Sequence, residues 1–310
     1  MALRRSTEIR RITTGIRELD QVLGGGIPEG SVVLVLGAPG IGKTIFLTQF
    51  VLAGVKTGEP GLYICFDETR ASYERNMRAF GWDLSRYENF HILDAYSMAR
   101  DPERFNLDDL VALVRDEVRD REIHRVSVDS LSSIPTFVLL RDQPDRARAA
   151  MRRFFDSFRA MRVTTLMSCE MEPTTKTGPF GFEVYLADGV IRMDTSLKED
   201  GVEWVRFFDI LKLRGAPHET IRVPYRLQPG VGVVGDWERV LAREGAAERF
   251  ARLDIDKLTR YRLLSLRKRY FERLGQPVPE ELERELKALE EEIGPFLEKQ
   301  RKRWKGRLGR

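Results

Sequence analysis

Residues 31–56 read SVVLVLGAPGIGKTIFLTQFVLAGVK, and this stretch decides the fold of the chain. The apolar, β-branched run from Val32 to Leu36 is typical of a buried parallel strand. After Thr44 the apolar residues recur at helical spacing, and between the two lies the pattern G-x-x-x-x-G-K-[ST]. A strand, a glycine-rich loop and a helix in this order predict a phosphate-binding loop.

The loop residues supply what a triphosphate needs. Glycines permit close backbone approaches, and their N–H groups form an anion site together with the helix N-terminus. Lys43 is expected to reach the β- and γ-phosphates, and the Thr44 hydroxyl is expected to ligate Mg²⁺. The chain is therefore predicted to bind a nucleoside triphosphate through the loop Gly37, Ala38, Pro39, Gly40, Ile41, Gly42, Lys43 and Thr44.

Length and composition set broad limits. A chain of 310 residues, 42% of them hydrophobic, is expected to form one large domain with an appendage, or two small domains. Its apolar runs are far shorter than the roughly 18–20 residues of a membrane-spanning helix, and no apolar signal core follows the first residues. Both cysteines lie in apolar, strand-like runs, which indicates buried thiols. We expect a cytoplasmic protein without membrane insertion.

The charge is distributed unevenly. Residues 1–240 carry 33 Lys and Arg against 35 Asp and Glu, whereas residues 241–310 carry 19 against 13. The main part is therefore not a basic nucleic-acid domain. The tail 299–310, KQRKRWKGRLGR, either contacts nucleic acid or an acidic partner, or is a solvated terminal helix.

Strand and helix patterns alternate along residues 32–168. Strands are predicted at 62–66, 90–94, 125–130 and 163–168, and helices at 69–80, 107–119 and 145–161. Before the loop, residues 13–28 favour a short helix and a glycine turn. From 184 to 226 the pattern changes to β-hairpins. The fold class is therefore α/β, with a mainly parallel central sheet and antiparallel edge hairpins.

Residues 236–310 differ from the rest. A basic helix is predicted at 256–274, and apolar residues at 4-3-4 spacing predict a second, acidic helix from Leu282 to Ile293. We therefore expect a nucleotide-binding domain at 1–235, which the resemblance described below implies is an ATPase domain, and a C-terminal helical extension with a basic tail at 236–310.

Acidic residues follow two of the predicted strands. Asp129 ends the run Val126–Val128 and is either a magnesium-site carboxylate alongside Thr44 or an ordinary strand-ending aspartate. Ser130 follows it, so a catalytic base must come from elsewhere. Asp67 and Glu68 are the candidates, and the alternative is an acidic turn that caps the next helix.

Taken together, the chain resembles the KaiC branch of the RecA/RadA-like ATPases over most of residues 6–235, as a single KaiC domain. The resemblance implies a RecA-like P-loop NTPase core that uses ATP and Mg²⁺. The family places adjacent glutamates at positions 67–68 and uses the first as base. Asp67 is one methylene shorter, so either it acts slowly or Glu68 replaces it. The matching stretches are 13–44, 66–69 (FDET), 80–84 (FGWDL), 125–132 (RVSVDSLS), 164–170 (TTLMSCE) and 212–215 (KLRG) with His218.

The resemblance also implies that a neighbouring subunit completes the site. Lys212, Leu213, Arg214 and His218 match a segment whose basic groups reach the γ-phosphate of the next subunit's ATP, which implies a ring, expected to be a hexamer. Spacing alone would place these cations on the solvated face of a strand. No Ser or Thr occurs in 182–188, where clock proteins are autophosphorylated, and this speaks against autokinase activity.

Two further matches are loose. Ser168 and Glu170 lie where RecA-like proteins place a nucleotide-sensing residue, although a structural cap explains them equally well. The loop 173–181, with Lys176 and Phe180, lies where recombinases hold single-stranded DNA, with little support from its composition.

The expected function is Mg²⁺-dependent ATP binding with slow hydrolysis in a ring, coupled through the C-terminal helices to an unidentified protein partner. Two alternatives remain open. One is a RadA-paralogue-like accessory ATPase of DNA repair or recombination that binds single-stranded DNA. The other is a nucleotide-dependent scaffold or sensor that does not hydrolyse ATP.

Overall fold

The computed structural model describes residues 10–140, 142–172, 177–197, 204–215, 218, 222–236, 261, 264, 268, 271 and 277–291. The chain divides into two compact units, Met1–Gly235 and Asp236–Arg310. The predicted basic tail, Lys176 and most of the predicted helix 256–274 lie outside the described residues.

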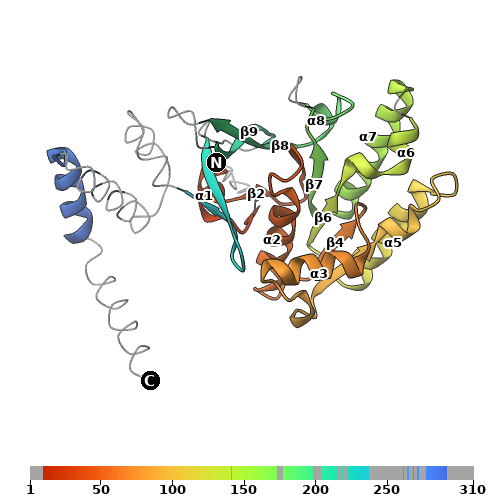
Figure 1. Ribbon diagram of the computed structural model, residues 1–310, viewed down its shortest axis with the longest axis horizontal. Coiled ribbons are helices and arrows are strands. Elements are labelled where there is room, and N and C mark those ends of the chain that lie inside the picture. The colour runs from red at the N-terminus through yellow and green to blue at the C-terminus, as the bar shows by residue number, and fades with distance from the viewer. Residues whose placement is uncertain are drawn as a thin grey trace, which may run out of the picture. The chain divides into compact units, whose positions relative to one another are not determined.

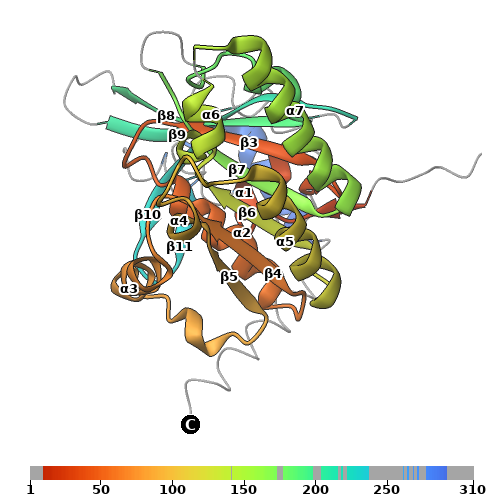
Figure 2. The same cartoon turned by 90° about the vertical axis from the view of Figure 1, so that its right-hand side faces the viewer.

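A mixed sheet runs through the first unit (Figures 1 and 2). Its strands lie in the order β11-β10-β9-β8-β3-β7-β6-β4-β5, and the six from β8 to β5 are parallel. A separate antiparallel pair, β1 with β2, flanks it. The strands are Arg11–Ile12 (β1), Ile27–Pro28 (β2), Val32–Gly37 (β3), Gly61–Cys65 (β4), Phe90–Asp94 (β5), Arg125–Asp129 (β6), Thr164–Glu170 (β7), Gly189–Leu197 (β8), Trp204–Leu213 (β9), Val223–Gln228 (β10) and Gly232–Gly235 (β11).

Helices cover both faces of the sheet. Local capping sets several helix starts: the Thr69 hydroxyl accepts from Ser72 N–H before α3, and the Asn106 side chain accepts from Asp108 N–H before α5. The helices are Arg17–Val22 (α1), Lys43–Val55 (α2), Arg70–Phe80 (α3), Ala95–Met98 (α4), Leu107–Asp120 (α5), Pro135–Leu139 (α6), Pro144–Met161 (α7) and Glu183–Leu186 (α8), with 3₁₀ turns at Leu84–Arg86 and Leu131–Ser133.

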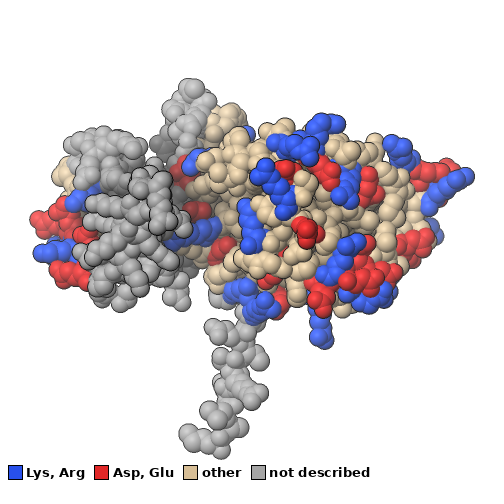
Figure 3. All heavy atoms as spheres, turned by 90° about the horizontal axis from the view of Figure 1, so that it is seen from below, with Lys and Arg blue, Asp and Glu red and all other residues tan. Residues whose placement is uncertain are grey.

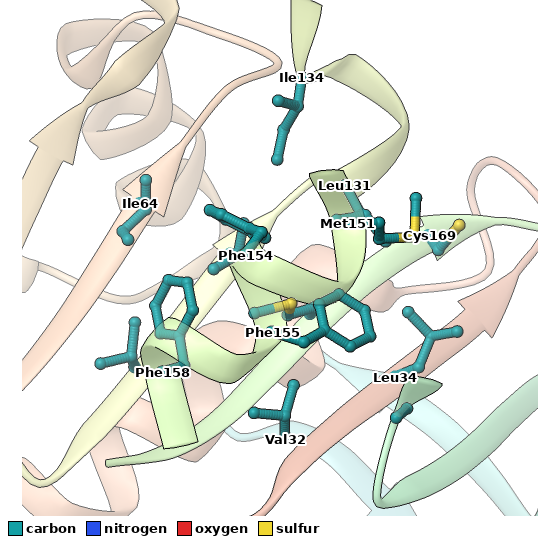
Figure 4. Packing of buried hydrophobic residues seen from close by; sticks show 14 of the residues in the cluster. Val32, Leu34, Ile64, Leu131, Ile134, Met151, Phe154, Phe155, Phe158 and Cys169 are labelled. Carbon is teal, nitrogen blue, oxygen red and sulfur yellow. The ribbon is translucent and has the colours of Figure 1, made fainter. Parts of the chain in front are cut away.

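The main core lies between the sheet and helices α5 and α7. Alternate residues of β3, Val32 and Leu34, point into it and meet Phe154, Phe155 and Phe158 of α7 (Figure 4). Leu36 belongs to the same cluster, and because side chains alternate along a strand, Val33 and Val35 point to the opposite face of the sheet, where α2 packs. The all-apolar sequence of β3 thus follows from burial on both faces.

The predicted α/β fold with a mainly parallel central sheet is confirmed, with local corrections. The predicted hairpin region from 184 begins instead with helix α8. Strand β8 pairs in parallel with β3 along one edge and antiparallel with β9 along the other. The period-2 pattern of β8 gives no strand direction, and the direction follows from the connection across α8. The short strands β1 and β2 and the helices α4 and α6 were not predicted.

In the second unit, residues 280–291 are helical. Leu264 is buried against Leu282, Leu286 and Leu289 in a small cluster. The Tyr261 hydroxyl donates to Glu290 Oε1 at 2.8 Å, and Lys268 lies 3.2 Å from Glu283. As residue numbers rise among Tyr261, Leu264 and Lys268, those of their partners on the helix at 280–291 fall, so these described positions pair in an antiparallel sense.

Charges of both signs are interspersed over the first unit. Figure 3 shows basic and acidic side chains alternating across the face drawn there, in keeping with the near balance of charge in residues 1–240. Within the described part of the chain, no helix combines the length and apolarity needed to cross a membrane.

Candidate nucleotide site

The phosphate loop lies between the last residue of β3, Gly37, and the first residue of α2, Lys43. Gly40 and Gly42 adopt φ values of 75° and 109°, a left-handed region that side chains rarely tolerate. The Lys43 ammonium donates to the carbonyl oxygens of Gly37 at 2.8 Å and Ala38 at 3.2 Å, so it lies across the loop. This is the predicted strand, loop and helix arrangement.

Partial burial lowers the pKa of Lys43 from its ordinary value, while the carboxylates of Asp129 and Glu170 act in the opposite direction. A bound polyphosphate would add negative charge beside the ammonium. The site therefore favours a charged Lys43 most strongly when an anion is present.

Asp129 ends β6, is 5% exposed, and is held by three hydroxyl groups. Its Oδ2 accepts from Thr44 Oγ1 at 2.7 Å and from the Tyr63 hydroxyl at 2.6 Å, and Ser168 Oγ donates to its Oδ1. The structure thus brings together the two predicted metal residues, Thr44 and Asp129. Ser168, which the sequence offered either as a nucleotide sensor or as a structural cap, supports the Asp129 carboxylate through its hydrogen bond.

Sequence reasoning missed Tyr63 because it lies inside an apolar run. Its position in the buried strand β4 is fixed by register, since Cys65 pairs with Asp129 and Tyr63 with Ser127 on β6. A tyrosine in a strand that is otherwise buried and apolar needs a partner for its hydroxyl. That requirement is the signal in the sequence that could have indicated the contact.

The adjacent carboxylates Asp67 and Glu68 point to different partners. Asp67 Oδ1 accepts from Ser130 Oγ at 3.1 Å, beside the end of β6. Glu68 Oε2 accepts from the Asn76 side chain on α3 at 2.7 Å. Loss of hydration raises the pKa of Asp67, and the nearby Asp129 carboxylate adds to the shift. Of the two, only Asp67 is therefore directed towards Asp129.

Oxygen donors are the ligands that Mg²⁺ prefers, and it is usually held by one or two protein groups together with substrate phosphates. The Thr44 hydroxyl and the Asp129 carboxylate, already in contact, fit that requirement. No cluster of three or more His, Cys, Asp or Glu side chains occurs among the residues that the structure describes. A fully protein-made metal cage is thus not part of that region, and phosphate oxygens together with water would complete the coordination.

The predicted trans residues lie at the other end of the sheet. Leu213 pairs with Gly189, which pairs with Val33 near the start of β3, whereas Gly37 pairs with Met193. The Arg214 N–H donates to the Asp188 carbonyl oxygen at 2.8 Å. Since a strand rises about 3.3 Å per residue, this end lies on the order of 13 Å from the phosphate loop.

Lys212 and Arg214 hold the end of α8. The Lys212 ammonium donates to the carbonyl oxygens of Val184, Tyr185 and Ala187 at 3.1, 3.2 and 2.6 Å. Arg214 donates to Tyr185 O at 3.0 Å, yet its side chain remains 56% exposed. His218 is half-buried.

The first unit matches a family of known proteins over nearly its whole length. Residues 12–238 match the model of the KaiC ATPase family. A UPF0273 protein of Methanopyrus kandleri is 33% identical over 251 residues, covering 76% of this chain and 96% of that protein. The circadian clock oscillator protein KaiC of Thermostichus vulcanus is 31% identical over 241 residues, covering 74% of this chain and 45% of that protein.

A solved structure agrees with these matches. The crystal structure of a KaiC-like protein from the archaeon Pyrococcus horikoshii superposes with a TM-score of 0.64 at 31% identity, covering 74% of this chain and 99% of that one. The phosphate loop, the hydroxyl-held Asp129 and these matches lead to one conclusion. The chain belongs to the KaiC family of ATPases, with a single KaiC domain.

Proposed function

We propose that the chain is a Mg²⁺-dependent ATPase of a ring assembly, expected to be hexameric, in which each site is completed by the next subunit. The observation that carries the proposal is that the phosphate loop with Lys43 and the segment with Arg214 lie at opposite ends of the sheet. Arg214 lies level with the start of β3, so it cannot reach the phosphate loop of its own chain.

In this proposal each chain contributes two halves of different sites. The loop residues and Lys43 bind the phosphates, and Thr44 with Asp129 would hold Mg²⁺, which neutralises phosphate charge when bound. Arg214 of a neighbour stabilises the charge that develops on the transferring phosphoryl group. Lys212, through its three carbonyl partners, fixes the segment from which Arg214 projects, and His218 is proposed to act with Arg214.

Asp67 is the proposed base that orients and deprotonates the attacking water. Its raised pKa makes it a better proton acceptor than an ordinary aspartate, and its direction towards Asp129 places it at the same strand ends as the metal residues. In this proposal the short side chain of Asp67 holds the water less well than a glutamate would, and ATP hydrolysis is therefore slow. The second unit, residues 236–310, is the proposed contact for a protein partner that responds to the nucleotide state.

A subunit-mixing experiment tests the shared site. Lys43→Ala removes the phosphate-binding half and Arg214→Ala removes the neighbour's half, so each variant alone is expected to be inactive. In a co-assembled equal mixture, about a quarter of the interfaces pair an intact loop with an intact Arg214, and turnover should return in proportion. A mixture that stays inactive although mixed rings form would refute completion in trans.

A further inference from the structure

The hairpin formed by β10 and β11 packs against the phosphate loop. The Tyr225 hydroxyl, on β10, donates to the carbonyl oxygen of Ile41 at 2.8 Å, and Tyr225 is only 3% exposed. Leu227, two residues on, lies so close to Gly42 that a Cβ atom there would come within 2.9 Å of its side chain. The hairpin therefore contacts two consecutive loop residues directly before Lys43.

The hairpin is itself anchored to the helix that follows the loop. The Gln49 side chain, on α2, accepts from Val233 N–H at 2.7 Å and donates to Val233 O at 3.1 Å. The ring of Tyr225 lies 4.4 Å from that of Phe208, and Phe208 lies 5.4 Å from Phe46 of α2. The β10–β11 hairpin thus contacts both the phosphate loop and the helix α2 that follows it.

Tyr225 supplies a donor that the loop's geometry requires. In a phosphate-binding loop the backbone N–H groups converge on the anion, so carbonyl oxygens need donors elsewhere. The Ile41 carbonyl is buried against β10, and the Tyr225 hydroxyl is the donor that it meets there. Without that hydroxyl, the carbonyl oxygen would lose its partner and the adjacent peptide would be free to turn.

We propose that Tyr225 is a positioning residue for the nucleotide: its hydroxyl, backed by the β10–β11 hairpin, fixes the peptide at Ile41 so that the loop amides point at the phosphates. This inference rests on the proposed nucleotide binding, but not on hydrolysis or on ring assembly. It predicts that ADP and ATP are affected alike, because both place phosphates in the loop.

Tyr225→Phe isolates the hydroxyl, since the ring that packs on Phe208 stays in place. One buried hydrogen bond contributes about 0.5–1.5 kcal/mol, which corresponds to about 2–13-fold weaker ADP binding. Thr164→Val is the control for the loss of one buried hydroxyl. Thr164 is 1% exposed, its hydroxyl accepts from Gly30 N–H at 3.0 Å, and it begins β7, at the end of that strand away from the phosphate loop.

The test measures ADP dissociation constants by calorimetry, thermal unfolding without nucleotide, and hydrogen exchange of the hairpin amides. We expect both variants to lose similar thermal stability. Only Tyr225→Phe should bind ADP more weakly, and only in this variant should ADP fail to slow the exchange of the Val233 N–H. Unchanged affinity of Tyr225→Phe, or equal losses in both variants, would overturn the positioning role. A wild-type chain that fails to bind ADP would instead overturn the proposed function.

Discussion

The phosphate loop and the segment Lys212–Arg214 both present cations, but they lie at opposite ends of the sheet and are held differently. At the loop, Lys43 is partly buried and the Asp129 carboxylate accepts hydrogen bonds from three hydroxyl groups. At the other end, Arg214 keeps more than half of its side chain in solvent. The difference teaches that the loop end is pre-organised by buried contacts, whereas the other end leaves a cation largely in solvent beside Asp188, as the proposed role towards a neighbouring subunit requires.

The largest expected effect comes from the exposed end. Arg214→Ala should lower turnover by about 10³-fold or more, because an arginine supplied by a neighbour stabilises the transition state. ATP binding should weaken much less. Arg148→Ala, which removes an exposed arginine on α7, serves as the control for loss of charge. Turnover and native mass are measured together, and undiminished turnover in intact rings would remove Arg214 from the mechanism.

A smaller effect is expected at the loop end, from the two carboxylates. Asp67→Asn should lower turnover by about 10²-fold, the usual contribution of a general base, while Glu68→Gln should change it less than tenfold. The reason is that Asp67 is directed towards Asp129, whereas Glu68 bonds Asn76. The reverse order of effects would assign the base to Glu68.

The pH profile gives an independent check on Asp67. Burial raises its pKa above the ordinary 3.8, and only the deprotonated carboxylate can accept a proton. Wild-type turnover should therefore fall as the pH is lowered through that raised pKa. Residual turnover of Asp67→Asn should lack this step, and an unchanged profile would contradict its role.

The smallest effect concerns stability rather than catalysis. Asp20, on α1, accepts from Thr14 N–H at 2.6 Å, and burial raises its pKa from 3.8 to about 7. Its contribution to stability is therefore present below about pH 4 and is lost as the pH rises towards 7. Asp20→Asn keeps the acceptor oxygen and should flatten this dependence in urea unfolding between pH 4 and 8. A variant with the same pH dependence as the wild type would rule Asp20 out as its source.

Much of the loop end could be predicted because its determinants are local. The glycines, Lys43 and Thr44 are consecutive, and Asp129 directly follows an apolar strand, so their roles follow from short patterns. The contacts of Tyr63 and Tyr225 could not be predicted in this way. Each joins residues far apart in the chain, 66 residues for Tyr63 with Asp129 and 184 for Tyr225 with Ile41, and these residues meet only once the sheet and the phosphate loop have packed together.

By itself, the sequence determined the phosphate loop, the alternation of strands and helices, and membership of the KaiC family, because periodicity and consecutive motifs encode them. Only the tertiary structure decided that β8 runs parallel to β3, that Asp67 rather than Glu68 is directed towards Asp129, and that Arg214 lies at the end of the sheet away from its own loop. The physical reason is that strand order and register are set by packing across the whole sheet. No local run of residues carries that information.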